Sequence, residues 1–149
     1  MRHIAIALAL QALLISQALA SEQSDVMMPI QQFIDGFNKG DFKTAVAACA
    51  DDASVIDDFP PHGWQGRGCE KWADAFQALA KKDGITAARI ASGKPRHIDV
   101  NEDHAYVVMP VTLYVDRGGK HKTLPSMFTA ALHRDAGGWR MTGWAWADL

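Results

Sequence analysis

The chain has 149 residues, which is the size of one domain. Its 15 Lys and Arg residues against 17 Asp and Glu residues give a formal net charge of −2, so neither a nucleic acid nor an anionic membrane surface is expected as a partner. Hydrophobic residues make up 48% of the chain and charged residues 21%, which is typical of a folded globular domain rather than a disordered chain. Its two cysteines are too few for a small fold that depends on several disulfides.

Residues 1–20 predict a secretory signal peptide. Arg2 belongs to a short polar start, an apolar run follows over 4–15, and the ALA at 18–20 has the small-x-small pattern of a cleavage site. The alternative, an N-terminal membrane anchor, requires a longer apolar run. We therefore expect export to the periplasm or out of the cell, a single domain over 21–149, and no membrane contact after cleavage.

The half of the domain before Gly84 predicts three helices, because apolar residues recur there at helical spacing. The first is capped by Ser24 or Asp25 and ends at Gly40, after which the second begins. The third runs from Gly68 to Gly84. Each helix carries an apolar stripe that must pack on a partner.

The second half predicts strands. β-Branched and aromatic residues fill 106–115, 124–133 and 139–147, and Gly-Gly turns separate these stretches. One or two further strands are expected over 85–100, and a short strand with a loop over 53–66. Consecutive strands joined by tight turns form an antiparallel meander, so the prediction is an α+β domain whose helices pack on one sheet face.

Alternation along these strands sorts their residues by face. Met109 and Leu113 share one face of their strand, and Trp144 and Trp146 share one face of the last strand. Such a surface facing three helices forms either a solid core or the wall of a cavity, and the sequence leaves both open. Two large tryptophans on one face are less ordinary, because each indole N–H needs a hydrogen-bond partner.

The order of helix, Gly-Asp, helix, acidic strand, Gly-Arg, helix and meander resembles the nuclear-transport-factor-2-like superfamily, and within it the SnoaL-like and ketosteroid-isomerase-like small enzymes. The stretches that carry the resemblance are FNKGD at 37–41, ADDASVID at 50–57, GR at 66–67, MP at 109–110 and WAW at 144–146. The resemblance covers nearly all of 21–149. It implies a cone-shaped fold, in which a curved antiparallel sheet wraps around three N-terminal helices and leaves an apolar cavity. This fold hosts many different activities.

The same resemblance implies roles for single residues. Asp57 falls where ketosteroid isomerases keep their general-base aspartate, and Trp146 matches a pocket tryptophan. Phe33 and Thr129 fall where those enzymes have the tyrosine and the protonated aspartic acid of the oxyanion hole, and of these two only Thr129 could still donate a hydrogen bond. Since one such donor is worth about 2.7–4 kcal/mol of transition-state stabilisation, steroid isomerisation by that route is not expected here.

The residues around Asp57 support a chemical role independently. Asp57 has the strand parity of Val55 and is expected to face inward, where desolvation raises the pKa of a carboxyl, whereas Asp58 faces outward. His62 follows in a loop that can fold over a pocket mouth, and a His–Asp pair can move protons or activate water. The alternative is that these are solvated loop residues.

Cys49 and Cys69 have two interpretations. In an exported protein a disulfide would join the end of the second helix to the start of the third, closing the segment that carries Asp57 and His62. Such a bridge would contribute about 3 kcal/mol. The alternative makes Cys69 a nucleophile at a helix N-terminus. We favour the bridge.

Neither a metal site nor a redox or nucleotide cofactor is predicted. The histidines at 97, 104, 121 and 133 show no metal-ligand spacing, and the cysteines form no CxxC pair.

We therefore expect an exported domain that binds a small apolar organic molecule, with Asp57 as polar anchor or as the base of an isomerase, dehydratase or cyclase, and with His62 at the rim. The expected pocket walls are Phe33, Met109, Leu113, Thr129, Trp144 and Trp146. The alternative is a non-catalytic scaffold or interaction module that dimerises through the outer sheet face, for which the candidates are Tyr106, Tyr114, Phe128 and Leu132. A cavity of several hundred cubic ångströms would favour the first hypothesis, and a filled cone the second.

Overall fold

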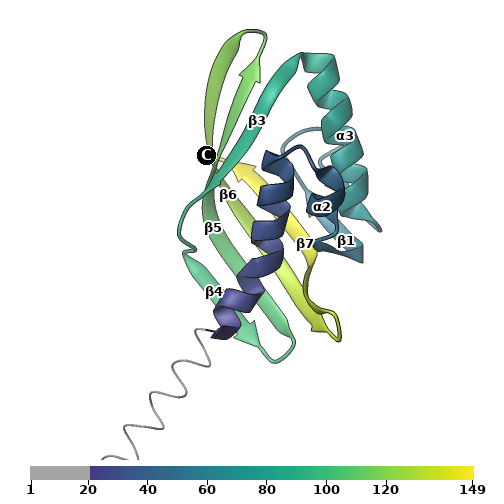
Figure 1. Ribbon diagram of the computed structural model, residues 1–149, viewed down its shortest axis with the longest axis vertical. Coiled ribbons are helices and arrows are strands. Elements are labelled where there is room, and N and C mark those ends of the chain that lie inside the picture. The colour runs from purple at the N-terminus through teal and green to yellow at the C-terminus, as the bar shows by residue number, and fades with distance from the viewer. Residues whose placement is uncertain (1–20) are drawn as a thin grey trace, which may run out of the picture.

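The N-terminal helix occupies 21–38 in this computed structural model, which describes residues 21–149 (Figure 1). The predicted signal peptide lies outside the described residues. One stripe of the helix is buried, and its members are Val26, Ile30, Phe33, Ile34 and Phe37. The helix already includes Ser24 and Asp25, so the predicted caps are wrong. Its end is fixed to the sheet by the Asn38 side chain, whose amide donates to the carbonyl oxygen of Ile90 at 2.8 Å and accepts from its N–H at 2.7 Å.

Two further helices follow, as predicted. α2 (Phe42–Val46) is short, and the Asp41 side chain caps it by accepting from the backbone N–H of Thr44. α3 (Gly68–Asp83) ends where Gly84 adopts a φ of +64°, a left-handed conformation that favours glycine. Gly68 lies against the sheet so closely that a Cβ there would be 2.5 Å from the carbonyl oxygen of Ala53. Because residue 68 has no side chain, the start of α3 can lie directly against the strand that leads to Asp57.

The strands form one seven-stranded sheet in the order β2-β1-β7-β6-β5-β3, with β4 paired to β5 as well. Their bounds are β1 (Cys49–Ile56), β2 (Gly63–Trp64), β3 (Ile85–Ser92), β4 (His97–Asn101), β5 (His104–Arg117), β6 (Lys120–Asp135) and β7 (Gly138–Asp148). β5, β6 and β7 make the predicted meander. β1 joins it by pairing in parallel with β7, a contact that tight turns alone do not predict.

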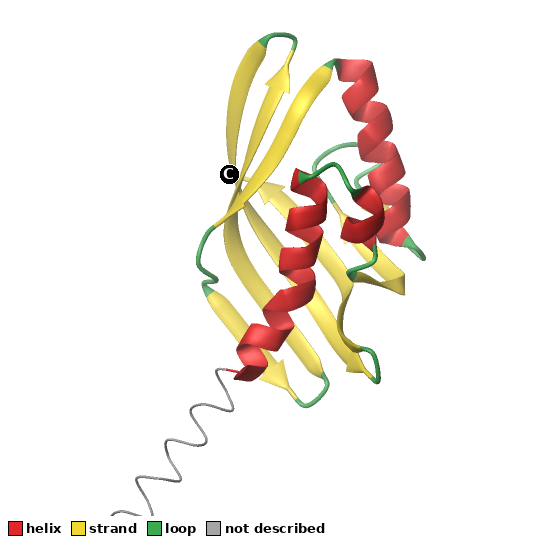
Figure 2. Ribbon diagram, in the orientation of Figure 1, coloured by secondary structure: helices red, strands yellow, loops and turns green. Residues whose placement is uncertain are grey.

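The sheet is curved and open, and the helices cover its concave face (Figure 2). β4 pairs with the first part of β5 and β3 with its second part, so two separate strands flank one long strand. The α+β prediction, with a curved sheet around N-terminal helices, is confirmed. No helix within 21–149 has the length and apolar character needed to cross a bilayer.

The face of β6 differs from the prediction. Phe128 and Leu132 are each 1% exposed and lie in the core, so their expected place on the outer face is wrong. Phe128 pairs with Met109 on β5 and with Trp146 on β7, both of which also face inward. Of the outer-face candidates, Tyr106 is exposed. Tyr114 is half-buried.

Candidate active site

Asp57 follows the last residue of β1, at the point where that strand runs beside β7. Along β1 Val55 is buried, Ile56 is 60% exposed and Asp57 is 8% exposed, so strand alternation continues one residue past the strand. Val55 pairs with Trp144, and Ile56 with Ala145. Asp57 therefore faces inward as its parity predicted, on the same cavity wall as Trp144 and Trp146 of β7.

Two hydrogen bonds hold the Asp57 carboxyl. Its Oδ2 accepts from the indole Nε1 of Trp72 at 2.6 Å, and its Oδ1 accepts from the backbone N–H of Asp58 at 2.7 Å. Burial raises the pKa of Asp57 to about 7, with a further upward contribution from the Asp58 side chain, and the hydrogen bonds from Trp72 and from the Asp58 backbone offset part of the rise. The carboxyl can therefore both take up and release a proton near neutral pH.

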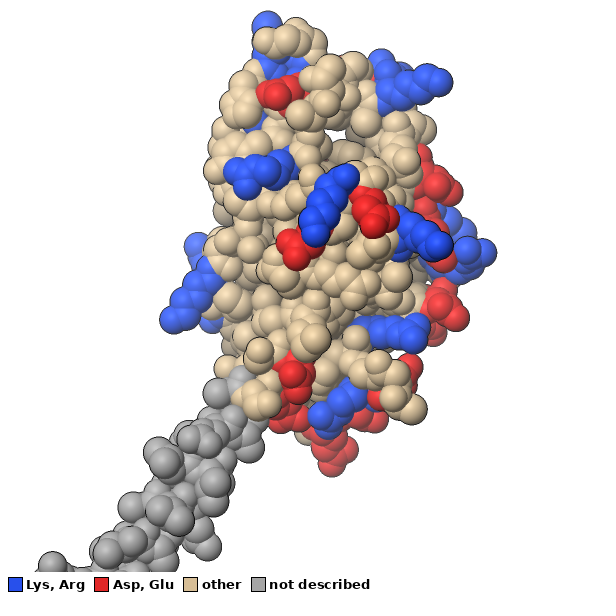
Figure 3. All heavy atoms as spheres, in the orientation of Figure 1, with Lys and Arg blue, Asp and Glu red and all other residues tan. Residues whose placement is uncertain are grey.

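A cavity of about 390 Å³ opens beside this carboxyl, between the N-terminal helix, α3 and the concave sheet face. Its wall is largely aromatic and includes Phe33, Phe37, Phe59, Trp72, Phe76, Trp144 and Trp146. Charged residues also line it, and Arg117 on β5 forms a salt bridge with Asp83 on α3, with an N–O distance of 3.0 Å. Figure 3 shows the molecule hollowed between the upper parts of α3 and β3. The cone is thus not filled by its own side chains.

Four of the six predicted wall residues line this cavity, namely Phe33, Leu113, Trp144 and Trp146. Met109 is 2% exposed and packs in the core without lining the cavity. Thr129 is a wrong prediction, because it pairs with Val108 and Ala145 on the outer face of the sheet. Phe128 takes the inward position, with its ring centroid 6.1 Å from that of Phe33. No hydroxyl from position 129 reaches the cavity.

The predicted His62–Asp57 pair does not form through the carboxylate. The Nδ1 atom of His62 lies 3.3 Å from the backbone oxygen of Asp57, and the residue is exposed in the turn after β1. His62 does not line the cavity. The partner of the carboxyl is instead Trp72, a buried residue of α3 for which the sequence predicted no role in the site. No local sequence pattern indicates this contact, because it depends on how α3 docks on β1.

The indole N–H groups of the cavity tryptophans are already used within the protein. Trp72 donates to Asp57, Trp144 donates to the Sγ of Cys69 at 3.3 Å, and Trp146 donates to Oδ1 of Asp148 at 3.0 Å. Phe33 offers no donor where the resemblance placed a tyrosine. These four aromatic residues therefore provide shape and an apolar medium, while Asp57 provides the ionisable group.

The predicted pairing is confirmed, with Cys49 and Cys69 joined at an S–S distance of 2.02 Å. The expected place of Cys49 at the end of the second helix is wrong, because α2 ends at Val46 and Cys49 begins β1. Both cysteines are buried, and the bond links the start of β1 to the first turn of α3. It thereby ties the strand that carries Asp57 to the helix that carries Trp72. A sulfur held in this bond is not a free thiolate, so the nucleophile interpretation of Cys69 does not apply to the bridged protein.

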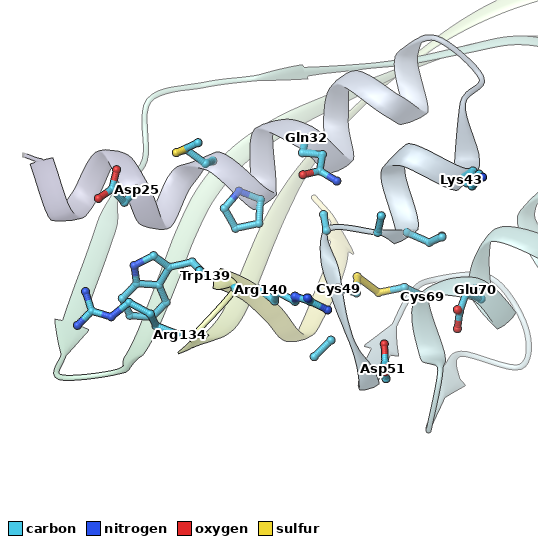
Figure 4. A pocket seen from close by; sticks show the side chains of 18 residues that line it. Asp25, Gln32, Lys43, Cys49, Asp51, Cys69, Glu70, Arg134, Trp139 and Arg140 are labelled. Atoms are coloured by element: carbon cyan, nitrogen blue, oxygen red, sulfur yellow. A yellow bond between two sulfur atoms is a disulfide. The ribbon is translucent and has the colours of Figure 1, made fainter.

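A larger hollow of about 780 Å³ is lined in part by the disulfide (Figure 4). Its labelled residues come from the N-terminal helix, from the β6–β7 hairpin and from the region of the disulfide, and they include charges of both signs: Asp25, Lys43, Asp51, Glu70, Arg134 and Arg140. Among the described residues the buried polar side chains are Asp57 and Ser126, and neither lines this hollow. The smaller cavity is therefore the better candidate for chemistry.

Comparison with known proteins places this geometry in a family. A model of the SnoaL-like domain matches residues 26–145. A ketosteroid isomerase-like protein from Erwinia carotovora atroseptica SCRI1043 has a similar structure, with a TM-score of 0.71 and 14% identity over 86% of this chain and 96% of that chain. An NTF2-like protein with a cystatin-like fold from Novosphingobium aromaticivorans gives 0.73 and 18% over 94% and 90% of the two chains.

A third similar structure is the hexachlorocyclohexane dehydrochlorinase LinA-type3 from Novosphingobium barchaimii LL02, with a TM-score of 0.74 and 15% identity over 88% of each chain. None of the curated proteins matches the chain significantly. At these identities the solved structures establish the fold alone. The family model, which covers most of the chain, shows that this chain belongs to the SnoaL-like domain family.

Proposed function

We propose that the protein binds a small, largely apolar organic molecule in the cavity of about 390 Å³ and that Asp57 moves a proton to or from it. The observation that carries the proposal is the buried Asp57 carboxyl on an aromatic wall, held by Trp72 and with a pKa raised to about 7. A cavity of this size favours ligand binding over the alternative of a filled, purely structural cone.

The geometry suits a carboxylate that acts as a general base. Each carboxylate oxygen accepts one hydrogen bond from the protein, which leaves lone pairs free to take a proton from a bound molecule. Because an apolar ligand displaces water from the cavity, the carboxylate loses solvation and becomes a stronger base. Asp58 also borders the cavity, but its residue is exposed to solvent, so it lacks the burial of Asp57.

Elimination fits the cavity better than isomerisation next to a carbonyl. Isomerisation builds negative charge on an oxygen that needs donors, yet Phe33 has none and Thr129 faces outward. In an elimination Asp57 takes the proton, the C–H electron pair forms the new double bond, and the leaving group departs with its own electron pair. A dehydrochlorinase among the similar structures supports this reaction class, although the assignment to this chain is ours.

Export remains part of the proposal. A buried disulfide is the kind of bond that persists in an oxidising compartment, so it supports the predicted passage to the periplasm or beyond. We also keep the proposed homodimer through the outer sheet face, now with Tyr106 and Tyr114 as its candidates and without Phe128 and Leu132.

The test of binding uses calorimetry with 2-naphthol, a neutral two-ring probe, on the wild-type protein and on Leu113→Trp. The larger side chain at this wall position fills part of the cavity, and we expect at least a tenfold loss of affinity with an unchanged fold. Thr129→Trp is the matched control, because it adds the same side chain on the outer face. Equal binding by wild type and Leu113→Trp would contradict the proposed site.

The test of chemistry uses a panel of apolar molecules that carry a halide or hydroxyl leaving group beside an acidic C–H bond. A positioned base is worth about 10²–10⁴-fold in rate, so Asp57→Asn should lose that factor while still binding the substrate. Asp52→Asn, an exposed carboxylate on β1 that does not line the cavity, should keep the activity within a few fold. Turnover by Asp57→Asn at the wild-type rate would remove Asp57 from the mechanism and leave a binding protein.

A further inference from the structure

Three side chains with metal-ligating atoms meet at the end of the sheet that carries the β4–β5 turn. Asp103 and His104 belong to that turn and to the start of β5, and His133 belongs to the end of β6. His104 and His133 are directly paired in the β5–β6 register. Directly paired residues of antiparallel strands project from the same face, so the two imidazoles are neighbours although they are far apart in the sequence.

The three groups already lie at short range. Nδ1 of His104 is 2.6 Å from Oδ1 of Asp103, and Nε2 of His133 is 3.3 Å from Oδ2 of the same carboxylate. The two imidazole centroids are 4.8 Å apart. One ligand atom from each residue lies within 4.8 Å of the other two. Such spacing allows all three to reach one ion after small side-chain rotations.

The backbone under this cluster is fixed by several contacts of Arg134. Its N–H donates to the carbonyl oxygen of Asp103 at 2.8 Å, and its guanidinium donates to the carbonyl oxygen of Glu102 at 2.9 Å and to the Glu22 carboxylate at 3.3 Å. These bonds join the turn, the end of β6 and the N-terminal helix. The cluster therefore rests on a rigid base while its side chains stay accessible.

We infer that Asp103, His104 and His133 form a binding site for a divalent transition-metal ion such as Zn²⁺, Cu²⁺ or Ni²⁺. Imidazole nitrogen suits these ions, whereas Mg²⁺ and Ca²⁺ prefer sites made of oxygen atoms. Metal–nitrogen bonds of about 2.0–2.1 Å require the ligand atoms to draw together, and the exposure of all three side chains leaves room for this. Remaining coordination positions are open to water.

The site is independent of the proposed catalytic cavity. None of its three residues lines that cavity. In Figure 1 the β4–β5 turn lies at the lower end of the sheet, whereas β3 and α3, which supply part of the cavity wall, meet at the upper end. Failure of the metal site would therefore leave the assignment of Asp57 unaffected, and the reverse also holds.

The test is calorimetric titration of the tag-free protein with Zn²⁺ after removal of bound metal by a chelator. We expect one saturable site, and no comparable binding of Mg²⁺ or Ca²⁺. Because losing even an outer-shell partner costs about 10–100-fold in metal affinity, His104→Gln and His133→Gln should each lose at least tenfold. Asp103→Asn should also weaken binding.

The matched control is His121→Gln. His121 forms the same kind of imidazole–carboxylate pair with Asp116 but is not part of a three-ligand group within the described residues. Its substitution should leave Zn²⁺ affinity unchanged. A wild-type protein that binds Zn²⁺ no more tightly than His104→Gln, or an equal loss in His121→Gln, would overturn the inference.

A measurement on the unmodified protein guards against variants that fold poorly. Substoichiometric Cu²⁺ should broaden the amide NMR signals around Asp103, His104 and His133 before any others. Broadening centred elsewhere, or spread over all histidines, would overturn the site in the same way.

Discussion

Replacing the Asp57 carboxyl by an amide should make the protein more stable at neutral and alkaline pH. In the wild type the folded chain holds a carboxylate in a cavity wall where burial disfavours the charge, and the pKa of Asp57 is raised to about 7 from its ordinary value of 3.8. The amide side chain of the Asp57→Asn variant is neutral at every pH. The variant therefore removes a destabilising ionisation that the structure places at the centre of the site.

The size of the effect follows from the pKa difference between the folded and unfolded chains. Each unit of that difference corresponds to about 1.36 kcal/mol, so full ionisation of Asp57 costs the folded state about 4 kcal/mol. Between pH 4 and 7 the folded chain binds the extra proton, and its free energy of unfolding falls as the pH rises through this window. Above pH 7 the loss is complete. The amide of Asp57→Asn avoids this loss. It also disrupts one of the two hydrogen bonds at the carboxyl, because its NH2 group cannot accept one, and this reduces the gain in stability by about 1 kcal/mol.

The assay is urea unfolding of wild type and Asp57→Asn at a series of pH values from 4 to 8. The free energy of unfolding of the variant minus that of the wild type should rise by several kcal/mol between pH 4 and 7 and level off between pH 7 and 8. Asp52→Asn, at an exposed position of β1, is the matched control for the loss of one carboxylate. If the difference in free energy of unfolding between Asp57→Asn and wild type did not change with pH, the claim that Asp57 is a buried carboxyl with a raised pKa would be refuted.

Other parts of the site give further predictions. Trp72→Phe keeps an aromatic ring but loses the N–H that lowers the pKa of Asp57, so the pH profile of any Asp57-dependent activity should move upward; an unchanged profile would show that the hydrogen bond has no effect. Replacing both Cys49 and Cys69 by Ser should reduce the free energy of unfolding by about 3 kcal/mol in urea, and the wild-type protein should show no reactive thiol before reduction. Thr129→Val should change 2-naphthol affinity by less than twofold, since this residue lies on the outer face; a large loss would return Thr129 to the pocket.

Much of the fold and the core of the site could be predicted from the sequence because they depend on local rules. Alternation along one short strand is enough to turn Asp57 inward, and a glycine stop with a helical stripe is enough to define α3. The disulfide partners were the two cysteines of the chain, so no choice of pairing arose.

The errors came from strand register. In β6, apolar residues occur in both phases, so the sequence alone does not show whether Phe128 or Thr129 faces the helices, and a shift of one residue reverses the face. In β7 the pairing with β6 shifts between Ala131 and Leu132, which lets Met141 and Trp144 both be buried although simple alternation places them on opposite faces.

Contacts between elements were equally hidden. The hydrogen bond from Trp72 to Asp57 depends on α3 docking closely on β1 through Gly68. The meeting of His104 and His133 depends on the register of the β5–β6 hairpin, whereas a search for metal-ligand spacing along the chain finds neither. Pairings of this kind are set by tertiary packing rather than by any local pattern.

The most direct measurement of the central claim is an NMR titration of the Asp57 side-chain carboxyl carbon between pH 3 and 9, with and without 2-naphthol. The account predicts a midpoint near 7 in the free protein, from the desolvation of the carboxyl in its aromatic wall, and a change in that midpoint when the probe displaces water from the cavity. A midpoint near 3.8 that does not respond to the probe would show a solvated carboxylate and contradict the proposed function.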